Sequence, residues 1–198
     1  MAVRISSGTL KGMIISTPDG QDTRPTASKV RSAVMNSCGD RIEGGRVLDC
    51  FAGSGAMGIE AISWGAKEVF FIENARPAVR AIKNNFQEII RRSKADSKSR
   101  HGEFILLDLD YLHGLRQLSK KENFDLIWLD PPYKFLFEMV YNEEFWNLIF
   151  ECLEDSGLIA IESCNKGASL LKEVADKSTW ELRRQKKYGH SHVTLIGK

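Results

Sequence analysis

The chain has 198 residues, of which 42% are hydrophobic and 27% charged, and its formal net charge is +2. This length suits one compact domain with a small appendage, and the composition excludes a disordered or fibrous protein. The uncharged stretches are too short to span a membrane and the N-terminus has no signal-peptide core, so we expect a cytoplasmic protein without membrane contact. The four cysteines stand far apart with no C-x-x-C pair, which favours reduced thiols over a metal site.

The first 45 residues predict an extension to the main domain, which we place at residues 46–198. "VRISSGTLKGMIIS" predicts a small hairpin around residues 8–12. "TASKVRSAVMNSC" predicts a helix that carries Val30, Ala33, Val34 and Cys38 on one apolar stripe. We therefore expect a hairpin and a helix that cover part of the domain.

From Arg46 onward, short apolar runs alternate with segments of helical period. The runs that predict strands are "RVLDCF", "EVFFIE", "FILLD", "FDLIWLD" and "GLIAIES", and the helices between them are predicted at residues 56–64, 77–92, 111–121, 135–153 and 168–176. The tail "WELRRQKKYGHSHVTLIGK" turns at Tyr188-Gly189 and predicts a C-terminal antiparallel hairpin. Together these elements predict an α/β fold with a doubly wound, Rossmann-like parallel sheet.

The first strand runs into a glycine-rich loop, "VLDCFAGSGAMGIEA", with the spacing Gly53-x-Gly55-x-x-Gly58. Such a loop lets the backbone approach a ligand at the start of a helix. The carboxylate of Asp49 would repel a pyrophosphate, whereas S-adenosylmethionine (AdoMet) carries an ammonium and a sulfonium and no phosphate. Glu73, about 20 residues further on, suits a ribose in either case. These residues favour AdoMet, and a nicotinamide-dependent oxidoreductase stays as the alternative.

The fourth strand ends in "LIWLDPPYKF". Each proline holds the preceding residue in extended geometry and lacks an N–H, so the segment presents acceptors followed by an aromatic ring. The carboxylate of Asp130 and the carbonyl of Pro131 or Pro132 could accept hydrogen bonds from an exocyclic amine of a nucleobase, and Tyr133 could stack on that base. This chemistry requires no metal and no covalent enzyme intermediate. It fits guanine N2, adenine N6 and cytosine N4 equally well.

These motifs resemble those of amino-group methyltransferases with an Asp/Asn-Pro-Pro-Tyr/Phe segment. More narrowly, the chain is similar to the bacterial 16S rRNA guanine-N2 methyltransferase family of the RsmD type, through "RISSGTLKG", "RPTASKVRSAVMN", "LDCFAGSGAMGIEAISWGA" and "FDLIWLDPPY". The resemblance implies an AdoMet-dependent enzyme that methylates one guanine, at position 966, in the 16S rRNA of a 30S subunit or an assembly intermediate. We expect a monomer.

The resemblance also implies roles for individual residues. The catalytic set is Asp130, Pro131, Pro132 and Tyr133. The cofactor set is Asp49, Phe51, Ala52, Gly53, Ser54, Gly55, Glu73, Asn74, Asp108, Leu109 and Asp130. Asp108 is preferred over Asp110 as the acid near the adenine because it ends the apolar run. The RNA set is Arg24, Thr26, Lys29 and Arg31.

Three other functions stay open at this point. An exocyclic-amine methyltransferase of DNA or of another RNA would use the same acceptors. The nicotinamide-dependent oxidoreductase would leave the Asp-Pro-Pro-Tyr segment without a role. A non-catalytic rRNA-binding assembly factor would keep the fold and the basic clusters at residues 91–102 and 183–187 without turnover.

Overall fold

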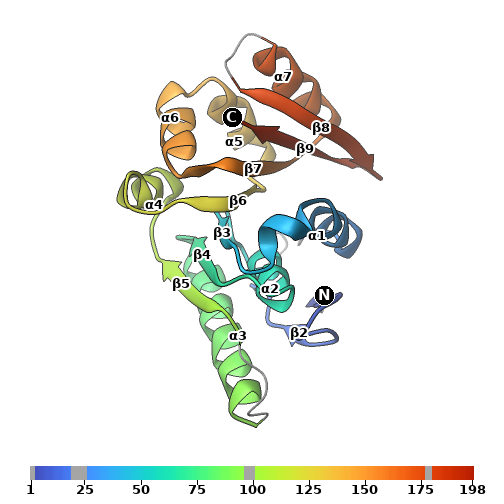
Figure 1. Ribbon diagram of the computed structural model, residues 1–198, viewed down its shortest axis with the longest axis vertical. Helices are drawn as coiled ribbons and strands as arrows, with labels where there is room; N and C mark the ends of the chain where they lie inside the picture. The colour runs from blue at the N-terminus through green and yellow to red at the C-terminus, as the bar shows by residue number, and fades with distance from the viewer. Residues whose placement is uncertain (1–2, 19–25, 96–100, 177–179) are drawn as a thin grey trace.

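The computed structural model describes residues 3–18, 26–95, 101–176 and 180–198. Its centre is a seven-stranded sheet in the order β5-β4-β3-β6-β7-β9-β8 (Figure 1). Five strands are parallel, namely β3 (Arg46–Asp49), β4 (Glu68–Ile72), β5 (Glu103–Leu107), β6 (Phe124–Leu129) and β7 (Leu153–Ser163). The last two, β8 (Glu181–Tyr188) and β9 (Ser191–Gly197), form an antiparallel hairpin that extends the sheet beyond β7. The predicted α/β class and the predicted C-terminal hairpin are confirmed.

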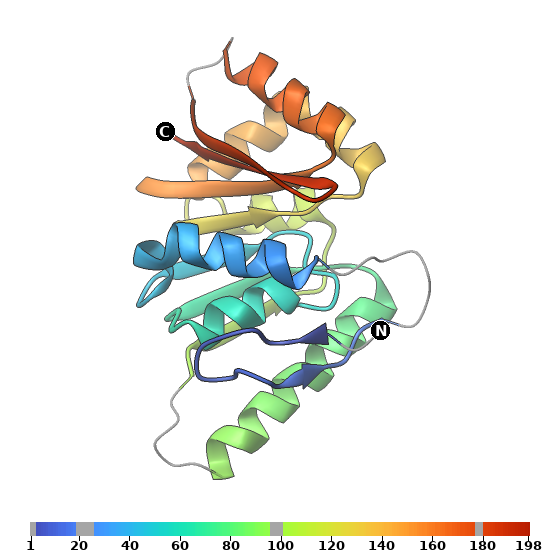
Figure 2. The ribbon, with the colours of Figure 1, turned by 90° about the vertical axis from the view of Figure 1, so that its right-hand side faces the viewer.

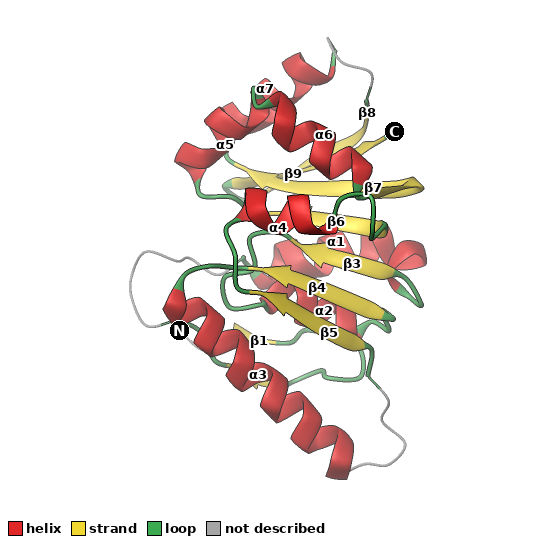
Figure 3. Ribbon diagram, turned by 90° about the vertical axis from the view of Figure 1, so that its left-hand side faces the viewer, coloured by secondary structure: helices red, strands yellow, loops and turns green. Residues whose placement is uncertain are grey.

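Helices cover both faces of the sheet. Those on one face are α1 (Ser28–Ile42), α2 (Ala56–Ser63) and α3 (Arg76–Ala95), and those on the other are α4 (Tyr111–Leu118), α5 (Tyr133–Val140), α6 (Glu143–Glu151) and α7 (Asn165–Ala175). Figure 2 looks onto α1 and α2, and Figure 3 looks onto the opposite face with α4 and α6. Neighbouring strand residues such as Val47 and Leu48 pack into different cores, which is why the strands read as continuous apolar runs.

The N-terminal hairpin packs against the face that α1 and α2 cover. Its strands β1 (Val3–Arg4) and β2 (Ile14–Ile15) pair antiparallel, as the sequence predicts, and lie beside α2 in Figure 2. Ile5, Leu10 and Met13 are buried in the same core as the helices of that face. Gly8 has a positive φ, and a Cβ there would lie 1.8 Å from the Ser63 carbonyl oxygen, so this close approach requires glycine.

One predicted helix is wrong. Residues 135–153 form two helices rather than one, because the chain leaves α5 at Tyr141 and starts again at Asn142. The Asn142 side chain accepts a hydrogen bond from the Phe145 N–H at 3.0 Å and so caps α6. Leu153, assigned to the helix by the sequence pattern, begins β7.

In the part of the chain that is described, no helix combines the length and apolar character needed to cross a bilayer.

The connections change direction between β3 and β6, which are adjacent in the sheet although five elements, from α2 to α4, separate them in the chain. In an open parallel sheet the crevice outside the carboxyl ends of the strands at such a point is the usual ligand site. The glycine-rich loop follows β3 and the Asp-Pro-Pro-Tyr segment follows β6. The two segments that the sequence singles out therefore meet at one edge of the sheet.

Candidate active site

Each of the five parallel strands ends in or beside an acidic residue. The five acids, which we call the acidic edge, are Asp49, Glu73, Asp108, Asp130 and Glu162. Four of them were predicted as site residues, and Glu162 was missed. Its signal was nevertheless present, because "GLIAIES" is an apolar run that ends in an acid like the others. The edge carries concentrated negative charge, which suits a cationic ligand and disfavours phosphate.

Asp49 lies under the glycine-rich loop and has only 1% of its surface exposed. One carboxylate oxygen accepts a hydrogen bond from the Gly58 N–H at 2.9 Å. The pKa of Asp49 is raised from 3.8 to about 7, chiefly by burial; the Gly58 N–H opposes this rise, and the charges of Asp130 and Glu73 contribute to it. Asp49 is thus a carboxylate held where its charge has little stabilisation.

The glycines of this loop have distinct steric roles. Gly53 and Gly55 adopt φ of 53° and 76°, in the left-handed region that other residues avoid. A Cβ at Gly58 would lie 2.3 Å from the ring of Phe71, so the third glycine allows α2 to pack against β4. The loop therefore turns sharply and leaves its backbone open at Gly53, where an added Cβ would meet nothing within 4 Å.

Glu73 connects the glycine-rich loop to the start of α3. Its Oε2 accepts a hydrogen bond from the Gly53 N–H at 2.8 Å, and its Oε1 accepts from the N–H groups of Asn74 and Ala75 at 2.9 and 2.8 Å. A carboxylate offers about four acceptor positions, so these three bonds leave room for a ligand hydroxyl. Glu73 is half-buried and Asn74 is exposed.

The structure separates the roles of Asp108 and Asp110. Asp110 is the N-cap of α4, where its side chain accepts a hydrogen bond from the His113 N–H at 3.1 Å and contacts His113 Nδ1 at 2.5 Å. Asp108 is exposed at the end of β5, and Leu109 beside it is half-buried. The ring of Phe51 lies 5.3 Å from that of Tyr111 and adds an aromatic wall on this side. Asp108 stays the predicted ligand acid, because the carboxylate of Asp110 is already engaged at the start of α4.

Asp130 is half-buried at the end of β6, beside Glu162 of β7. The pKa of Asp130 is raised to about 7, chiefly by burial and also by the charge of Glu162. A hydrogen bond from the Thr26 hydroxyl to Asp130 Oδ2, 2.7 Å long, opposes this rise by stabilising the carboxylate. Asp130 therefore has a donor on one oxygen and a neighbouring acid that disfavours its charge.

The two prolines that follow differ in what their carbonyls can do. Pro132 is the N-cap of α5, and its carbonyl accepts a hydrogen bond from the Leu136 N–H at 3.1 Å. Pro131 is buried and precedes the helix, so its carbonyl takes no part in that cap. Tyr133 begins α5, and its side chain lies outside what the structure describes. Of the two carbonyls, that of Pro131 is the better placed to serve a ligand.

Comparisons with known proteins identify the group to which this site belongs. A family model described as "Conserved hypothetical protein 95", the RsmD family, matches residues 3–197. This chain belongs to the RsmD-type methyltransferase family. Ribosomal RNA small subunit methyltransferase D of Buchnera aphidicola subsp. Baizongia pistaciae is 30% identical over 202 residues, which cover 98% of this chain and 91% of the relative.

Two further relatives support the same assignment. Ribosomal RNA small subunit methyltransferase D of Escherichia coli K12 is 29% identical over 189 residues, which cover 94% of this chain and 85% of that protein. The solved structure of a hypothetical protein from Thermus thermophilus has a TM-score of 0.74, with 26% identity and 99% of each chain covered. The RsmD-type similarity thus spans the N-terminal hairpin as well as the sheet.

The RNA set that the RsmD-type resemblance implied is only partly compatible with the structure. Lys29 is exposed on the first turn of α1. Arg31 is wrong as an RNA contact, because only 2% of its surface is exposed and its guanidinium is hydrogen-bonded inside the protein. Thr26 is bonded to Asp130, and Arg24 lies outside the described residues. Of the predicted RNA-binding cations, only Lys29 is therefore both described and exposed.

Exposed cations occur at the C-terminal hairpin, on the same edge as Asp130. Lys187 of β8 pairs with His192 of β9, which pairs with Ser163 at the carboxyl end of β7. The side chains of Lys186 and Lys187 are exposed, and Lys186 Nζ lies 5.6 Å from the centre of the Tyr188 ring. In Figure 2 the turn of this hairpin and the first turn of α1 lie on the same side of the molecule.

Asn85 of α3 is a further residue that sequence reasoning missed. Its side-chain amide donates hydrogen bonds to the carbonyls of Ser16 and Ser54 at 3.0 and 3.1 Å, and its oxygen accepts one from the Ser16 N–H at 2.7 Å. It is 2% exposed. Asn85 therefore joins the N-terminal hairpin to the glycine-rich loop, and an asparagine within a helical pattern gives no sequence signal for such a link.

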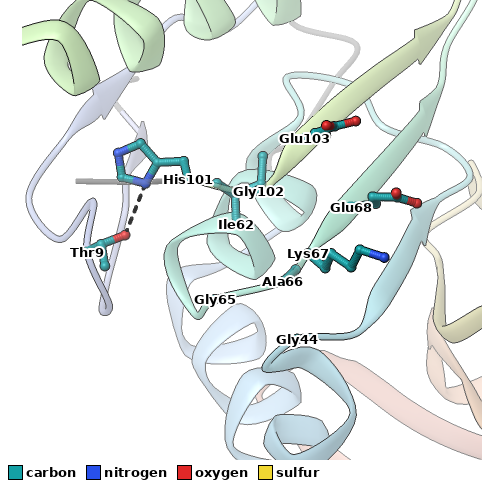
Figure 4. A pocket seen from close by; sticks show the side chains of 10 residues that line it. All are labelled: Thr9, Gly44, Ile62, Gly65, Ala66, Lys67, Glu68, His101, Gly102 and Glu103. Atoms are coloured by element: carbon teal, nitrogen blue, oxygen red, sulfur yellow. Dashed lines mark hydrogen bonds between the residues drawn. The ribbon is translucent and has the colours of Figure 1, made fainter. Parts of the chain in front are cut away.

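A cavity of about 370 Å³ lies at the opposite edge of the sheet. Thr9, Lys67, Glu68 and His101 are among its lining residues, and a hydrogen bond of 3.4 Å joins Thr9 to His101 (Figure 4). Glu68 and Glu103 are the first residues of β4 and β5, so this cavity is at the amino ends of the strands. It contains none of the residues of the acidic edge.

Proposed function

We propose that this protein transfers a methyl group from AdoMet to the N2 exocyclic amine of one guanine, at position 966, in 16S rRNA. The observation that carries the proposal is the meeting of the glycine-rich loop and Asp130-Pro131 at the acidic edge. Small subunit rRNA methyltransferase relatives over nearly the full chain support rRNA as the acceptor. The substrate is a 30S subunit or an assembly intermediate in the cytoplasm.

The donor set at the acidic edge fits AdoMet. Glu73 has an acceptor position left for a ribose hydroxyl, Asp108 is exposed at the end of β5 and could accept from the adenine amine, and Asp49 provides the negative charge that an ammonium or sulfonium needs. The backbone of Ala52, Gly53, Ser54 and Gly55 would line the cofactor, with Phe51 beside it. When bound, AdoMet supplies a reactive methyl and its own leaving group. The protein contributes position and electrostatics.

The acceptor amine would be oriented by two oxygens. One N–H of the guanine amine would donate to Asp130 Oδ1, because Oδ2 already accepts from Thr26. The other would donate to the Pro131 carbonyl, because that of Pro132 serves α5. These two bonds would direct the nitrogen lone pair to the methyl, which is a proximity effect rather than covalent catalysis. Tyr133 would stack on the flipped base.

The surface next to Asp130 would hold the RNA backbone. Lys186 and Lys187 are exposed on the strand whose pairing leads through His192 to Ser163 at the carboxyl end of β7. Lys29 is exposed on the first turn of α1, close in sequence to Thr26, which bonds to Asp130. Phosphate contacts by lysines position a nucleic acid without reading its sequence. A base flipped out of a loop could then reach the acidic edge, while the phosphates stay with the cations.

The proposal is tested by incubating the purified protein with tritiated AdoMet and three acceptors: 30S subunits that lack the modification, naked 16S rRNA and duplex DNA. Digestion to nucleosides should show label as N2-methylguanosine in a ribosomal sample. Label only in DNA, as N6-methyladenine or N4-methylcytosine, would retain the amine chemistry and overturn the substrate. Binding of NADH in place of AdoMet, with no label in any sample, would overturn the proposal altogether.

A further inference from the structure

Among the described residues, one hydrogen bond joins the N-terminal extension to the acidic edge. Thr26 Oγ1 donates to Asp130 Oδ2 at 2.7 Å, across 104 positions of the sequence. A hydroxyl that donates to a carboxylate forms a charge-assisted bond, which is shorter and stronger than a neutral one. The hydroxyl donates its only proton to Asp130 Oδ2, an oxygen that could otherwise accept a hydrogen bond from the substrate amine.

Thr26 is held in place by a buried arginine. The Thr26 carbonyl accepts a hydrogen bond from Arg31 Nη1 at 2.7 Å, and Arg31 Nη2 donates to the Arg4 carbonyl at 2.7 Å. Arg31 Nε donates to Glu60 Oε1 at 3.2 Å, with the two side chains 2% and 0% exposed. Glu60 Oε1 also accepts from the Ser6 N–H at 2.8 Å. One ion pair therefore joins the N-terminal hairpin, α1 and α2 around Thr26.

Such a buried pair gives little net stability, because the two charges lose their hydration, and its better-attested use is to fix one arrangement of the chain. The arrangement fixed here places the first turn of α1 against the end of β6. The position of Thr26 relative to Asp130 then depends on Arg31 of α1 and on Glu60 of α2, the helix that follows the glycine-rich loop.

We infer that Thr26 is a positioning residue for Asp130, because its hydroxyl fixes Oδ2 and leaves Oδ1 directed to the substrate amine. The inference rests on the proposed function, and it gives the N-terminal extension a part in the methyl transfer. It also assigns Arg31 and Glu60 the task of holding Thr26. Asp130 faces Glu162 from β7 and Asp49 from β3, both acidic, so the Thr26 donor works against two neighbouring charges.

The test compares Thr26→Val, which keeps the shape and removes the donor, with Thr26→Ser, which keeps the donor. At saturating AdoMet, Thr26→Val should lower kcat on the 30S acceptor by roughly 10-fold or more, the range for losing a hydrogen bond to a charged group. The acid limb of the profile of kcat against pH should move to higher pH in Thr26→Val, since Asp130 would be harder to ionise without the donor. Thr26→Ser should restore both properties.

A matched control removes a hydroxyl from the same extension without touching Asp130. The Thr9 hydroxyl lies 3.4 Å from the Ser63 carbonyl, so Thr9→Val should leave kcat and the pH profile at wild-type values. In apo-protein labelled with ¹³C-aspartate, the carboxyl signal of Asp130 is assigned as the one that is missing from Asp130→Asn. This signal should titrate at a higher pH in Thr26→Val than in the wild type. This signal reports on the contact without any turnover.

The inference would be overturned if Thr26→Val had the same kcat, the same pH profile and the same Asp130 carboxyl titration as the wild type. A Thr26→Val protein whose kcat falls only in proportion to a loss of folded protein, with an unshifted pH profile, would overturn it too. An inactive wild-type protein would instead overturn the proposed function, so the two failures are distinguishable. If label enters another nucleic acid, the same comparison is made with that acceptor.

Discussion

The two edges of the parallel sheet differ in whether their acidic residues form ion pairs. At the amino edge, the guanidinium of Arg46 forms ion pairs with Glu68, at 2.6 Å, and with Glu122, and it lies 5.5 Å from the rings of Phe70 and Phe124. At the carboxyl edge, Asp49, Glu73, Asp108 and Asp130 form no ion pair within the described part of the chain.

We interpret this difference as a division between an edge organised for stability and an edge organised for a ligand. Paired charges at a partly exposed position cost little, whereas buried carboxylates without cations lose hydration and gain no ion-pair partner. Two carboxyl groups whose pKa is raised to about 7 at one edge of the sheet are a sign of a functional site. A cationic cofactor would supply the missing partner.

The largest effect is expected from Asp130→Ala. It removes the acceptor that orients the substrate amine, and we expect kcat to fall by roughly 10³-fold while the Kd for AdoMet changes only a few-fold. The matched control at the amino edge is Glu122→Gln, which should leave kcat unchanged and lower the unfolding free energy by about 0.2–1 kcal/mol. Radiolabel transfer and calorimetric titration check both variants, and full activity in Asp130→Ala would refute the assignment.

A smaller effect is expected from Asp49→Asn. The amide oxygen can still accept from the Gly58 N–H, so the loop is retained, but the charge that attracts the cofactor is lost. We expect the Kd for AdoMet to rise on the order of 10-fold and the Tm of the apo-protein at pH 8 to increase. Unchanged affinity in a titration would show that Asp49 is only a structural support for the loop.

The fold followed from the sequence better than the site did. Apolar runs and glycine turns are local features, so the five strands and both hairpins could be predicted. The break at Asn142 had a local signal too, an asparagine followed by two glutamates, which is typical of a helix start. The helical stripe also hinted at the burial of Arg31, which is spaced three or four residues from Val34 and Met35.

The partners of these residues could not be predicted. The contact between Thr26 and Asp130, the pairing of Arg31 with Glu60, and the bonds of Asn85 to Ser16 and Ser54 join segments that are 29 to 104 positions apart. Only the packing of helices on the sheet determines them. The acids at strand ends are the exception, since the parallel topology alone brings them to one edge.

Removing the exposed lysines of the C-terminal hairpin should weaken RNA binding moderately and leave the methyl-transfer step unchanged. Combining Lys186→Ala with Lys187→Ala should weaken 30S or rRNA binding roughly 10-fold and reduce the salt slope of log Kobs by about 1.5. The matched control combines Lys120→Ala with Lys121→Ala, at two exposed lysines that follow α4. It should leave the affinity for RNA and the salt slope unchanged. Equal salt slopes for the two pairs would place the RNA elsewhere.

The smallest effect is expected in the pH dependence of stability. The pKa of Asp49 is raised from 3.8 to about 7 in the folded protein, so the folded state binds the proton more tightly than the unfolded state. Its contribution to the unfolding free energy is fully present below about pH 4 and is lost as pH rises to about 7. Urea denaturation should therefore show a shallower loss of stability over this range in Asp49→Asn than in the wild type.

The position of the cofactor distinguishes the two edges most directly. A crystal structure of the protein with S-adenosylhomocysteine should show the ligand at the carboxyl edge, with its ribose at Glu73, its adenine near Asp108 and its sulfur facing Asp130. A ligand bound instead in the cavity between Thr9 and His101, at the amino edge, would contradict the assignment of the acidic edge as the active site.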